Sequence, residues 1–495
     1  MPFFKCEVLM KTEKSFVTYE EFGAVGNGIH DDLPAIVACH DYANANHIPV
    51  RAQDGAEYYI GGKAIFARVT TDTDFGTAKF IIDDRRLEDH SVYCFEVESD
   101  FEEYVPEITS IKAGQKKIDF SHRGKTFVRV YGDERERVYI RKGLNMNAGD
   151  VPVECFVVDE DGNVLNDINW DYTNISKITA KCVDDEPITI SGGIFTTVAN
   201  QWICEYASHK RGIRITRSNV TVKNIQHYIT GELSDHGAPY SGFITIFKNY
   251  NTTFYDSTLT PHRTYQMESK VPGKQVSMGT YDLSMTFALN VTLKNLKQSR
   301  PLDALEFWGI MGTNFCKDVT ILDCEISRFD AHCGVTNCTI RRSRFGYAGL
   351  NLIGFGKFIL EDSYVNAPQM LTLRSDYGSS FNGEVIIKNC VWRPLFNRNL
   401  NVIFAYNSAD HYFGYDSVMS KSIEIDGLTI DDAHIDEDKT LCVLPDYDAS
   451  FEKDKPHKYI LPEKITIKNT KALSGRTILP FLKPEQYEGV VFKLL

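Results

Sequence analysis

Side chains that could carry out acid–base chemistry fall at alternate positions of four short segments with the pattern of β-strands. The segments are residues 303–309, 330–335, 349–354 and 370–378. Alternate residues of a strand point to opposite faces, so the apolar residues of each segment define its buried side. This phase puts the following side chains on the outward side: Glu306, Trp308, Asp330, His332, Asn351, Thr372 and Arg374. We expect carboxylates, an imidazole, a guanidinium and an indole to share one exposed face.

Asp303 and Asp330 are the first candidates for a catalytic pair. Each begins an Asp-Ala segment, and on consecutive coils of a solenoid their backbones would lie about 5 Å apart. Two carboxyl groups this close cannot both ionise freely, so one pKa rises and that group can act as an acid. Glycosidic bond cleavage uses one such acid beside a second carboxylate that serves as base or nucleophile. Strict alternation gives Asp303 the inward phase of Leu305, so Asp303 faces outward only at a bend.

Three further residues of this face complete the hydrolase hypothesis. Glu306 could replace either aspartate, and His332, together with Arg374, would orient the substrate or stabilise charge. A carboxyl separation of about 5–5.5 Å predicts retention of configuration, and about 6.5–9.5 Å predicts inversion. Side-chain splay leaves both outcomes open.

A lyase acting on a uronate-containing glycan by β-elimination is the alternative enzyme. Such an enzyme neutralises the uronate carboxylate with a cation and removes the C5 proton with a base. Arg328, Arg374 and Lys317 could supply the cation, and Asp376 and Tyr377 follow Arg374 directly with a carboxylate and a ring for stacking.

Three more polar runs predict a wall that would contact the sugar. Aromatic rings stack on sugar faces, and histidine and arginine bind hydroxyls or carboxylates. The wall would contain Tyr240, His262, Arg263 and Tyr281, beside Trp308 and Arg328. The histidines do not have the HExxH spacing, and no Cys/His metal spacing, phosphate-binding loop or GxSxG elbow occurs. We therefore expect no metal site and no cofactor.

A recurring hexamer provides the elements that must position these side chains. It alternates apolar and polar residues and ends near Asn, Asp or Gly, starting at residues 187, 219, 251, 290, 318, 337, 357, 384, 422 and 464. The shortest spacings between starts are 19 and 20 residues, close to one coil of a parallel β-helix, and longer spacings indicate inserted loops. A β-sandwich would instead show turn signals every 8–12 residues or so. The repeat predicts an all-β, right-handed parallel β-helix from about residue 187 to 469.

The residue that closes each hexamer predicts a tight bend. Asn and Asp tolerate the left-handed backbone conformation, and stacked Asn side chains can hydrogen-bond from coil to coil. The closing positions are Asn224, Asp256, Asn295, Asp323, Asp362, Asn389 and Asn469.

The N-terminal region carries a second signal for the same fold. It contains Phe22-Gly23-Ala24, then Gly26-Asn27-Gly28, then Asp31-Asp32 before an amphipathic helix, and a strand follows at residues 54–59. This order resembles the opening of the pectate-lyase-like β-helix superfamily, which includes polygalacturonase-type hydrolases, pectate lyases and phage tailspikes. We expect Asp31-Asp32 to cap the helix. Leu33 stands where the superfamily usually has threonine.

The resemblance implies chemistry that this chain matches only in part. Polygalacturonase-type hydrolases invert, but their Asn-Thr-Asp, Asp-Asp, Gly-His-Gly and Arg-Ile-Lys runs do not occur here. Pectate lyases hold calcium with acidic residues, so a calcium ion would be expected if this chain were a lyase. A fold of this kind does not by itself define a reaction.

The resemblance and the repeat together predict three regions. Residues 1–96 would form an N-terminal cap with a cap helix and the first coils, 97–185 a small β-rich insertion, and 186–495 the main β-helix with a C-terminal cap. The insertion lacks the hexamer and contains a hairpin-type Asp161-Gly162 turn. From residue 139 onward the chain also resembles bacterial and phage β-helix proteins of the neck-appendage type.

Composition limits the partners. The chain has 495 residues, 43% of them hydrophobic and 24% charged, with a net charge of −13. This charge argues against nucleic acid or an anionic membrane as partner, whereas a local basic cluster could still bind an acidic sugar. The first residues lack the apolar core of a signal peptide, so we expect a cytoplasmic protein, with a phage virion left open.

Three functions follow as hypotheses. The first is a carbohydrate-active enzyme, a glycoside hydrolase acting on an oligo- or polysaccharide with Asp303, Asp330, Glu306 and His332. The second is the polysaccharide lyase. The third is a phage-type appendage that binds surface glycan without cleaving it, possible as a homotrimer.

Overall fold

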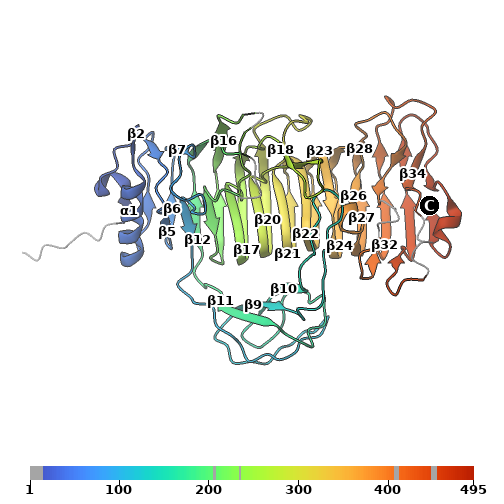
Figure 1. Cartoon of the computed structure of the whole chain (residues 1–495), viewed down its shortest axis with the longest axis horizontal. Helices are drawn as coiled ribbons and strands as arrows, with labels where there is room; N and C mark the ends of the chain where they lie inside the picture. Colours follow the sequence, from blue (N-terminus) through green and yellow to red (C-terminus); the bar gives the residue numbers. More distant parts are fainter. Residues whose placement is uncertain (1–14, 204–207, 234–235, 406–411, 448–453) are drawn as a thin grey trace, which may run out of the picture.

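The protein is an elongated parallel β-helix with a side insertion (Figure 1). The computed structural model describes residues 15–203, 208–233, 236–405, 412–447 and 454–495. Strands of successive coils stack along the long axis, with the only α-helix of this part of the chain at one end. Within these residues, no helix is both long and apolar enough to cross a membrane.

The first coils precede the insertion. They contain β1 (Val17–Thr18), η1 (Tyr19–Phe22), β2 (Asn27–Asp31), α1 (Leu33–Asn46), β3 (Val50–Arg51), β4 (Glu57–Ile60), β5 (Ala67–Val69), β6 (Thr73–Asp74), β7 (Lys79–Asp83) and β8 (Phe95–Val97). The insertion carries β9 (Thr126–Tyr131), β10 (Val153–Val158) and β11 (Lys177–Cys182), an antiparallel sheet in the order β10-β9-β11.

The main β-helix follows the insertion. Its first half contains β12 (Ile188–Ser191), β13 (Ile194–Val198), β14 (Ile213–Ile215), β15 (Val220–Lys223), β16 (Gln226–Thr230), β17 (Ile244–Leu259), β18 (Tyr265–Glu268), β19 (Gln275–Met278), β20 (Leu283–Gln298), β21 (Met311–Leu322), β22 (Glu325–Arg341), β23 (Arg344–Leu352), β24 (Gly354–Glu361) and β25 (Tyr364–Asn366).

The second half reaches the C-terminal end. It contains β26 (Leu371–Leu373), η2 (Ser375–Tyr377), β27 (Phe381–Lys388), β28 (Val391–Arg393), β29 (Leu400–Asn401), β30 (Ile403–Phe404), β31 (Ser417–Val418), β32 (Ser422–Asp426), β33 (Thr429–Ile430), β34 (Leu441–Leu444), β35 (Tyr459–Ile460), β36 (Lys464–Lys468), β37 (Lys471–Ala472), β38 (Leu479–Phe481), η4 (Pro484–Tyr487) and β39 (Val491–Leu494).

The ten predicted hexamers form one continuous parallel ladder. Each pairs in register with the hexamer of the next coil, through the residues Ile188, Val220, Thr252, Val291, Val319, Cys338, Phe358, Val385, Ile423 and Ile465. All ten are buried, so the apolar phase of the hexamer does mark the inside of the solenoid. The predicted fold is confirmed.

The predicted bends are confirmed as well. All seven closing Asn and Asp residues have φ between 47° and 57°, the left-handed region. Some also bond between coils, as when Asn295 Nδ2 donates to Asp256 Oδ1 at 2.7 Å. A second left-handed series opens five of the hexamers, at Asn219, Asn251, Asn290, Asp318 and Asn337. Within it, Asn251 donates to Asn219 at 2.6 Å and Asn290 donates to Asn251 at 3.0 Å.

The N-terminal cap contains the expected helix, but Asp31-Asp32 cap it only in part, since Asp31 Oδ1 accepts the Leu33 N–H at 3.3 Å. The helix α1 covers the first coils, and Asp32 is its N-cap residue. The Asp32 carboxylate makes no bond to the first turn of the helix. It accepts the backbone N–H groups of Val25 and Gly26 at 2.7 and 3.1 Å, so it fixes the glycine-containing entry loop.

The insertion is docked on a bend of the solenoid. One face of its sheet packs on Phe287 and Leu289, in an apolar cluster to which Val153, Cys155 and Val157 of β10 contribute. The insertion also supplies Glu154, which forms an ion pair with Lys317 of β21, and the two side chains are 2% and 3% exposed. A buried ion pair is costly to break from one side, so this contact fastens the insertion to the coils below it.

Candidate functional site

Asp330 lies at the centre of a buried cluster of charges. Its side chain projects from β22 and the residue is fully buried. Arg374 Nη1 lies 2.7 Å from Asp330 Oδ1, and Arg328 Nη2 lies 3.2 Å from Oδ2. The Tyr281 hydroxyl also donates to Oδ2. Every side-chain oxygen of Asp330 is therefore occupied by a donor.

The electrostatics keep Asp330 ionised. Burial alone would raise the pKa of this carboxyl, but the Arg374 and Arg328 guanidiniums outweigh burial and hold the pKa well below its usual range. An acid catalyst needs the opposite shift. Asp330 is thus placed as the anchor of two arginines, and it is not available as a proton donor.

The same cluster reaches the insertion. Arg374 Nη2 and Arg141 Nε each lie 2.7 Å from Asp376 Oδ2, and Arg141 belongs to the insertion. Both guanidiniums also lie over the ring of Tyr377, at 4.9 and 5.5 Å from its centroid. Tyr377 is 1% exposed, so it is a platform for the arginines and cannot stack on a sugar.

The predicted pair of Asp303 and Asp330 is not formed. Residues 303–306 are exposed or half-buried turn, and Leu305, expected to face the core, is 56% exposed. The strand of this coil is β21, and its Gly312 is the neighbour of Asp330. The assignment of 303–309 to a strand was wrong because one coil takes about 20 residues and the Asp-Ala segments are farther apart.

Glycine at position 312 makes room for Tyr281. A Cβ atom there would lie 2.7 Å from the Tyr281 ring, closer than van der Waals contact allows. Tyr281 therefore crosses the coil at Gly312 to reach Asp330. Gly312 and Tyr281 are both visible in the sequence. The assignment of residues 303–309 to the strand hid the fact that Gly312 is the neighbour of Asp330.

Beside the charge cluster, a polar groove of about 410 Å³ runs along the solenoid. This size is within the range of ligand pockets, about 300–1,000 Å³. Its floor comes from stacked outward residues of consecutive coils, in which Arg214 pairs with Thr245 and Thr245 with Ser284. The groove is lined by Tyr93, Ser208, Lys210, Arg214, Tyr240, Ser241, Thr245, Phe247, Gly279, Tyr281, Ser284, Thr286, Asn314 and His332.

The charged groups that line this groove are basic. Lys210 is exposed, and Arg214 contacts Glu96 at 3.0 Å while lying over the rings of Tyr93 and Phe247. No carboxylate belongs to the lining within the part of the chain that the structure describes. The groove is thus a local basic feature of an acidic protein.

His332 closes one end of the groove. Its Nδ1 lies 3.1 Å from Asn314 Oδ1, and its Nε2 lies 3.5 Å from the Tyr377 hydroxyl. Burial, assisted by the Arg374 charge, lowers the pKa of His332 to about 4. His332 is therefore neutral at pH 7 and can offer a hydrogen bond but no charge.

Trp308 and Arg328 lie beside the groove, in contact with its lining residues Gly279 and Tyr281. The Arg328 guanidinium lies 4.3 Å from the Trp308 ring centroid and donates to the Trp308 carbonyl at 3.1 Å. The indole packs directly on Gly279, where a Cβ atom would lie 2.1 Å from Cγ. Trp308 is half-buried, and neither Trp308 nor Arg328 belongs to the lining of the groove.

Of the three remaining predicted wall residues, Tyr240 lines the groove, whereas Arg263 and His262 do not. Tyr240 is 7% exposed, and its hydroxyl accepts the Asn200 N–H at 2.8 Å. Arg263 is half-buried, with its guanidinium 5.9 Å from the Phe307 ring centroid. His262 is 1% exposed and belongs to a buried charge cluster whose other members were not among the predicted site residues.

That cluster joins two histidines to two carboxylates. His227 Nδ1 lies 2.7 Å from Asp282 Oδ2, and His262 lies 3.6 Å from Asp282 and 3.2 Å from Glu232. Burial would lower the pKa of His262, but hydrogen bonds and charges from Asp282 and Glu232 outweigh it and raise the pKa to about 9. The cluster stabilises the coils beneath the groove and has no opening to a substrate.

This cluster predicts a loss of stability at alkaline pH. The pKa of His262 is raised from an unfolded value of about 6.5, so its stabilising contribution is complete below about pH 6.5 and disappears as pH rises through about 9. We expect the urea midpoint of the protein to fall between pH 6.5 and 9 by more than that of the His262→Gln variant. Equal pH dependence of the two proteins would contradict this assignment.

No group of three or more His, Cys, Asp or Glu side chains suited to a metal ion occurs among the described residues. Lys317, considered as a uronate-neutralising cation, is instead bound to Glu154.

Comparisons with known proteins place the fold. No protein-family model matches the chain, and no curated protein matches it. Among solved structures, the Pseudomonas phage phi297 tailspike gp61 aligns at 13% identity over 97% of this chain and 84% of that chain, with a TM-score of 0.56. The gp54 tailspike of Acinetobacter baumannii bacteriophage AP22, solved in complex with A. baumannii capsular saccharide, aligns at 9% identity over 94% and 74%, with a TM-score of 0.51. These likenesses show the fold alone, which is a right-handed parallel β-helix.

Proposed function

We propose that the protein binds an acidic polysaccharide in the groove between Tyr93 and His332. The observation that carries this proposal is the lining itself, which combines basic groups, aromatic rings and hydroxyls without a described carboxylate. A groove along a solenoid offers equivalent positions on successive coils about 4.8 Å apart, a repeat that suits a chain-like ligand.

The groove chemistry favours a sugar that carries carboxylates. Lys210 would attract the negative groups, while Arg214, whose charge is paired with Glu96, would offer its remaining guanidinium N–H groups as hydrogen-bond donors. Hydroxyl and amide side chains of Ser284, Thr286 and Asn314 would bind sugar hydroxyls. The half-buried Phe247 and Tyr281 would pack on the apolar faces of sugar rings.

The contacts of the predicted residues argue against both the lyase and the paired-aspartate hydrolase mechanisms. Arg328 and Arg374 are the cations of the lyase hypothesis, but both guanidiniums are bound to Asp330. The hydrolase hypothesis needs Asp330 beside a second carboxylate, and Gly312 occupies the neighbouring position. Binding is therefore the function that the geometry supports best, and the saccharide complex of the AP22 tailspike agrees with it.

Reversing one charge in the groove should weaken binding. We expect Lys210→Glu to reduce affinity for an acidic polysaccharide by about fivefold to tenfold, because an exposed charge contributes about 1 kcal/mol. The polysaccharide would be selected from a panel of carboxylated glycans, and affinity measured by calorimetry at low salt.

A matched control separates the groove from the general charge of the protein. Lys294→Glu makes the same charge change on β20, the strand that also carries Ser284 and Thr286, but in its other, exposed segment outside the groove. Its affinity should equal that of the parent protein. Equal weakening by both variants would reject the groove as the binding site.

Hydrolysis is the second candidate, and one observation favours it. Asp303 and Glu306 are exposed carboxylates of the turn that carries Trp308. The turn is fixed, since the Glu306 carbonyl accepts the Thr264 N–H at 2.9 Å and the Leu305 carbonyl accepts the Tyr347 hydroxyl at 3.1 Å. New reducing ends that disappear in both Asp303→Asn and Glu306→Gln would establish cleavage. Binding without product would leave recognition as the function.

A further inference from the structure

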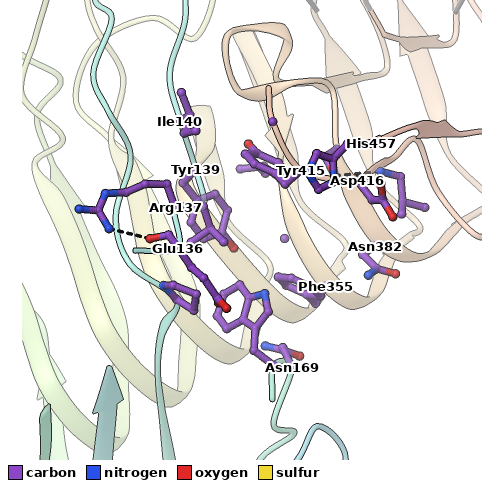
Figure 2. A pocket seen from close by; sticks show the side chains of 18 of the residues that line it. Glu136, Arg137, Tyr139, Ile140, Asn169, Phe355, Asn382, Tyr415, Asp416 and His457 are labelled. Atoms are coloured by element: carbon purple, nitrogen blue, oxygen red, sulfur yellow. Dashed lines mark hydrogen bonds and ion pairs between the residues drawn. The ribbon is translucent and has the colours of Figure 1, made fainter. Parts of the chain in front are cut away.

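A second cleft, of about 680 Å³, lies between the insertion and the solenoid (Figure 2). The insertion contributes residues around Tyr139 and Trp170, and the solenoid contributes residues of β24, β27 and the segment before β31. Its lining consists of Arg135, Glu136, Arg137, Val138, Tyr139, Ile140, Pro152, Asn169, Trp170, Ile353, Gly354, Phe355, Ser380, Asn382, Gly414, Tyr415, Asp416, Val418 and His457.

Aromatic rings from both sides meet at the base of this cleft. The centroids of Trp170 and Phe355 lie 4.9 Å apart with an interplanar angle of 82°, and those of Trp170 and Tyr139 lie 6.2 Å apart. Trp170 and Phe355 are each half-buried. Elsewhere on the solenoid, the insertion packs on Phe287 and Leu289, whereas Trp170 and Phe355 both line the cleft.

Polar groups of balanced charge surround the rings. Arg135 and Arg137 are matched by Glu136 and Asp416, and Asp416 lies 3.5 Å from His457. Asn382 lies on the solenoid side of the cleft (Figure 2), and its Oδ1 is buried without a hydrogen-bond partner among the described residues. A buried carbonyl oxygen without a donor costs about 1–3 kcal/mol, so the Asn382 amide gains a partner if it turns to meet a ligand hydroxyl.

The cleft is assembled before any ligand arrives. The Glu154 carboxylate accepts the backbone N–H groups of Asn169 and Trp170 at 3.1 and 3.3 Å while it binds Lys317. On the other side, Lys142 N–H donates to the Asp376 carbonyl at 2.8 Å. Both anchors join the insertion to the solenoid, and a preformed site loses less entropy on binding.

We propose that this cleft binds an uncharged hexose unit of a glycan. The half-buried rings of Trp170 and Phe355 suit the apolar face of a sugar, Asn382 suits a hydroxyl, and the balanced lining charges select against an acidic group. The site is separate from the basic groove, and this inference does not depend on the function proposed there.

The test uses the full chain and neutral oligosaccharides. Purified hexaoses of glucose, mannose and galactose would be titrated while tryptophan fluorescence and heat are recorded. We expect at least one to bind, to alter the fluorescence of the parent protein, and to lose that fluorescence change in Trp170→Phe.

Two cleft variants and one groove variant locate the ligand. Phe355→Leu and Asn382→Ala should each weaken binding by about fivefold or more, while Lys210→Glu should leave it unchanged. Unchanged thermal unfolding would show that both cleft variants are folded. The proposal is overturned if no hexaose binds, if both folded cleft variants bind as the parent does, or if only Lys210→Glu weakens binding.

Discussion

Replacing Asp330 with Asn should lower the free energy of unfolding by about 3–5 kcal/mol, the cost of leaving a buried charge without its partner. Asp330 is fully buried, and its carboxylate faces the guanidiniums of Arg374 and Arg328. The amide would keep the volume but would remove the negative charge. Chemical unfolding monitored by circular dichroism gives the difference directly.

Asp303→Asn is the matched control for this variant. The two aspartates were expected to act together, but Asp303 lies in an exposed turn, where such a change alters stability by about 0.5 kcal/mol or less. A small effect at Asp330, or equal effects at both positions, would contradict its role as the anchor of the arginines.

The second large effect is expected at the joint between the insertion and the solenoid. Lys317→Met leaves the Glu154 carboxylate buried without its cation, although the backbone N–H groups of Asn169 and Trp170 still donate to it. We expect a loss of about 3–5 kcal/mol, together with weaker hexose binding, because Glu154 also positions Trp170. Unfolding midpoints and the titration described for the cleft would measure both losses.

A double variant shows whether the unpaired charge of Glu154 or the lost packing of Lys317 causes this loss of stability. Lys317→Met combined with Glu154→Gln removes both charges and keeps an acceptor for the Asn169 and Trp170 N–H groups. The pair should be more stable than Lys317→Met alone, since no unpaired charge remains. A double variant less stable than Lys317→Met would show that the ion pair is not what fastens the insertion.

The repeating part of the fold was predictable because residues close together in the sequence determine each coil. Each hexamer carries its own alternation and its own bend residue, and all ten hexamers pair in register. Left-handed Asn and Asp residues such as Asn224 and Asp256 mark the bends in sequence and in structure. Neither feature needs knowledge of a distant segment.

The candidate site was less predictable because loops and long-range contacts decide it. Asp303 has the local pattern of a strand but lies in a turn, and the strand is formed by Met311–Leu322. Within β22, a register shift between Asp330 and Cys333 interrupts the alternation, so Cys333 is half-buried and not in the core.

The local sequence pattern also could not predict which residues the charged side chains bind. Arg141 and Asp376 are 235 positions apart, and Lys317 and Glu154 are 163 positions apart. Sequence alternation shows which way a side chain points, but only the packed insertion shows which charge it meets. Arg374 therefore has no evident partner in the sequence, whereas in the structure its guanidinium is bound to Asp330 and Asp376.

One comparison of affinities tests the central claim that an acidic glycan lies in the basic groove. The parent protein and Lys210→Glu would each be titrated with one acidic oligosaccharide and with the same oligosaccharide after its carboxylates are reduced to hydroxyls. We predict that the parent prefers the acidic form by about tenfold and that Lys210→Glu loses most of this preference. Equal affinity of the parent for both forms, or a preference unchanged in Lys210→Glu, would contradict the account.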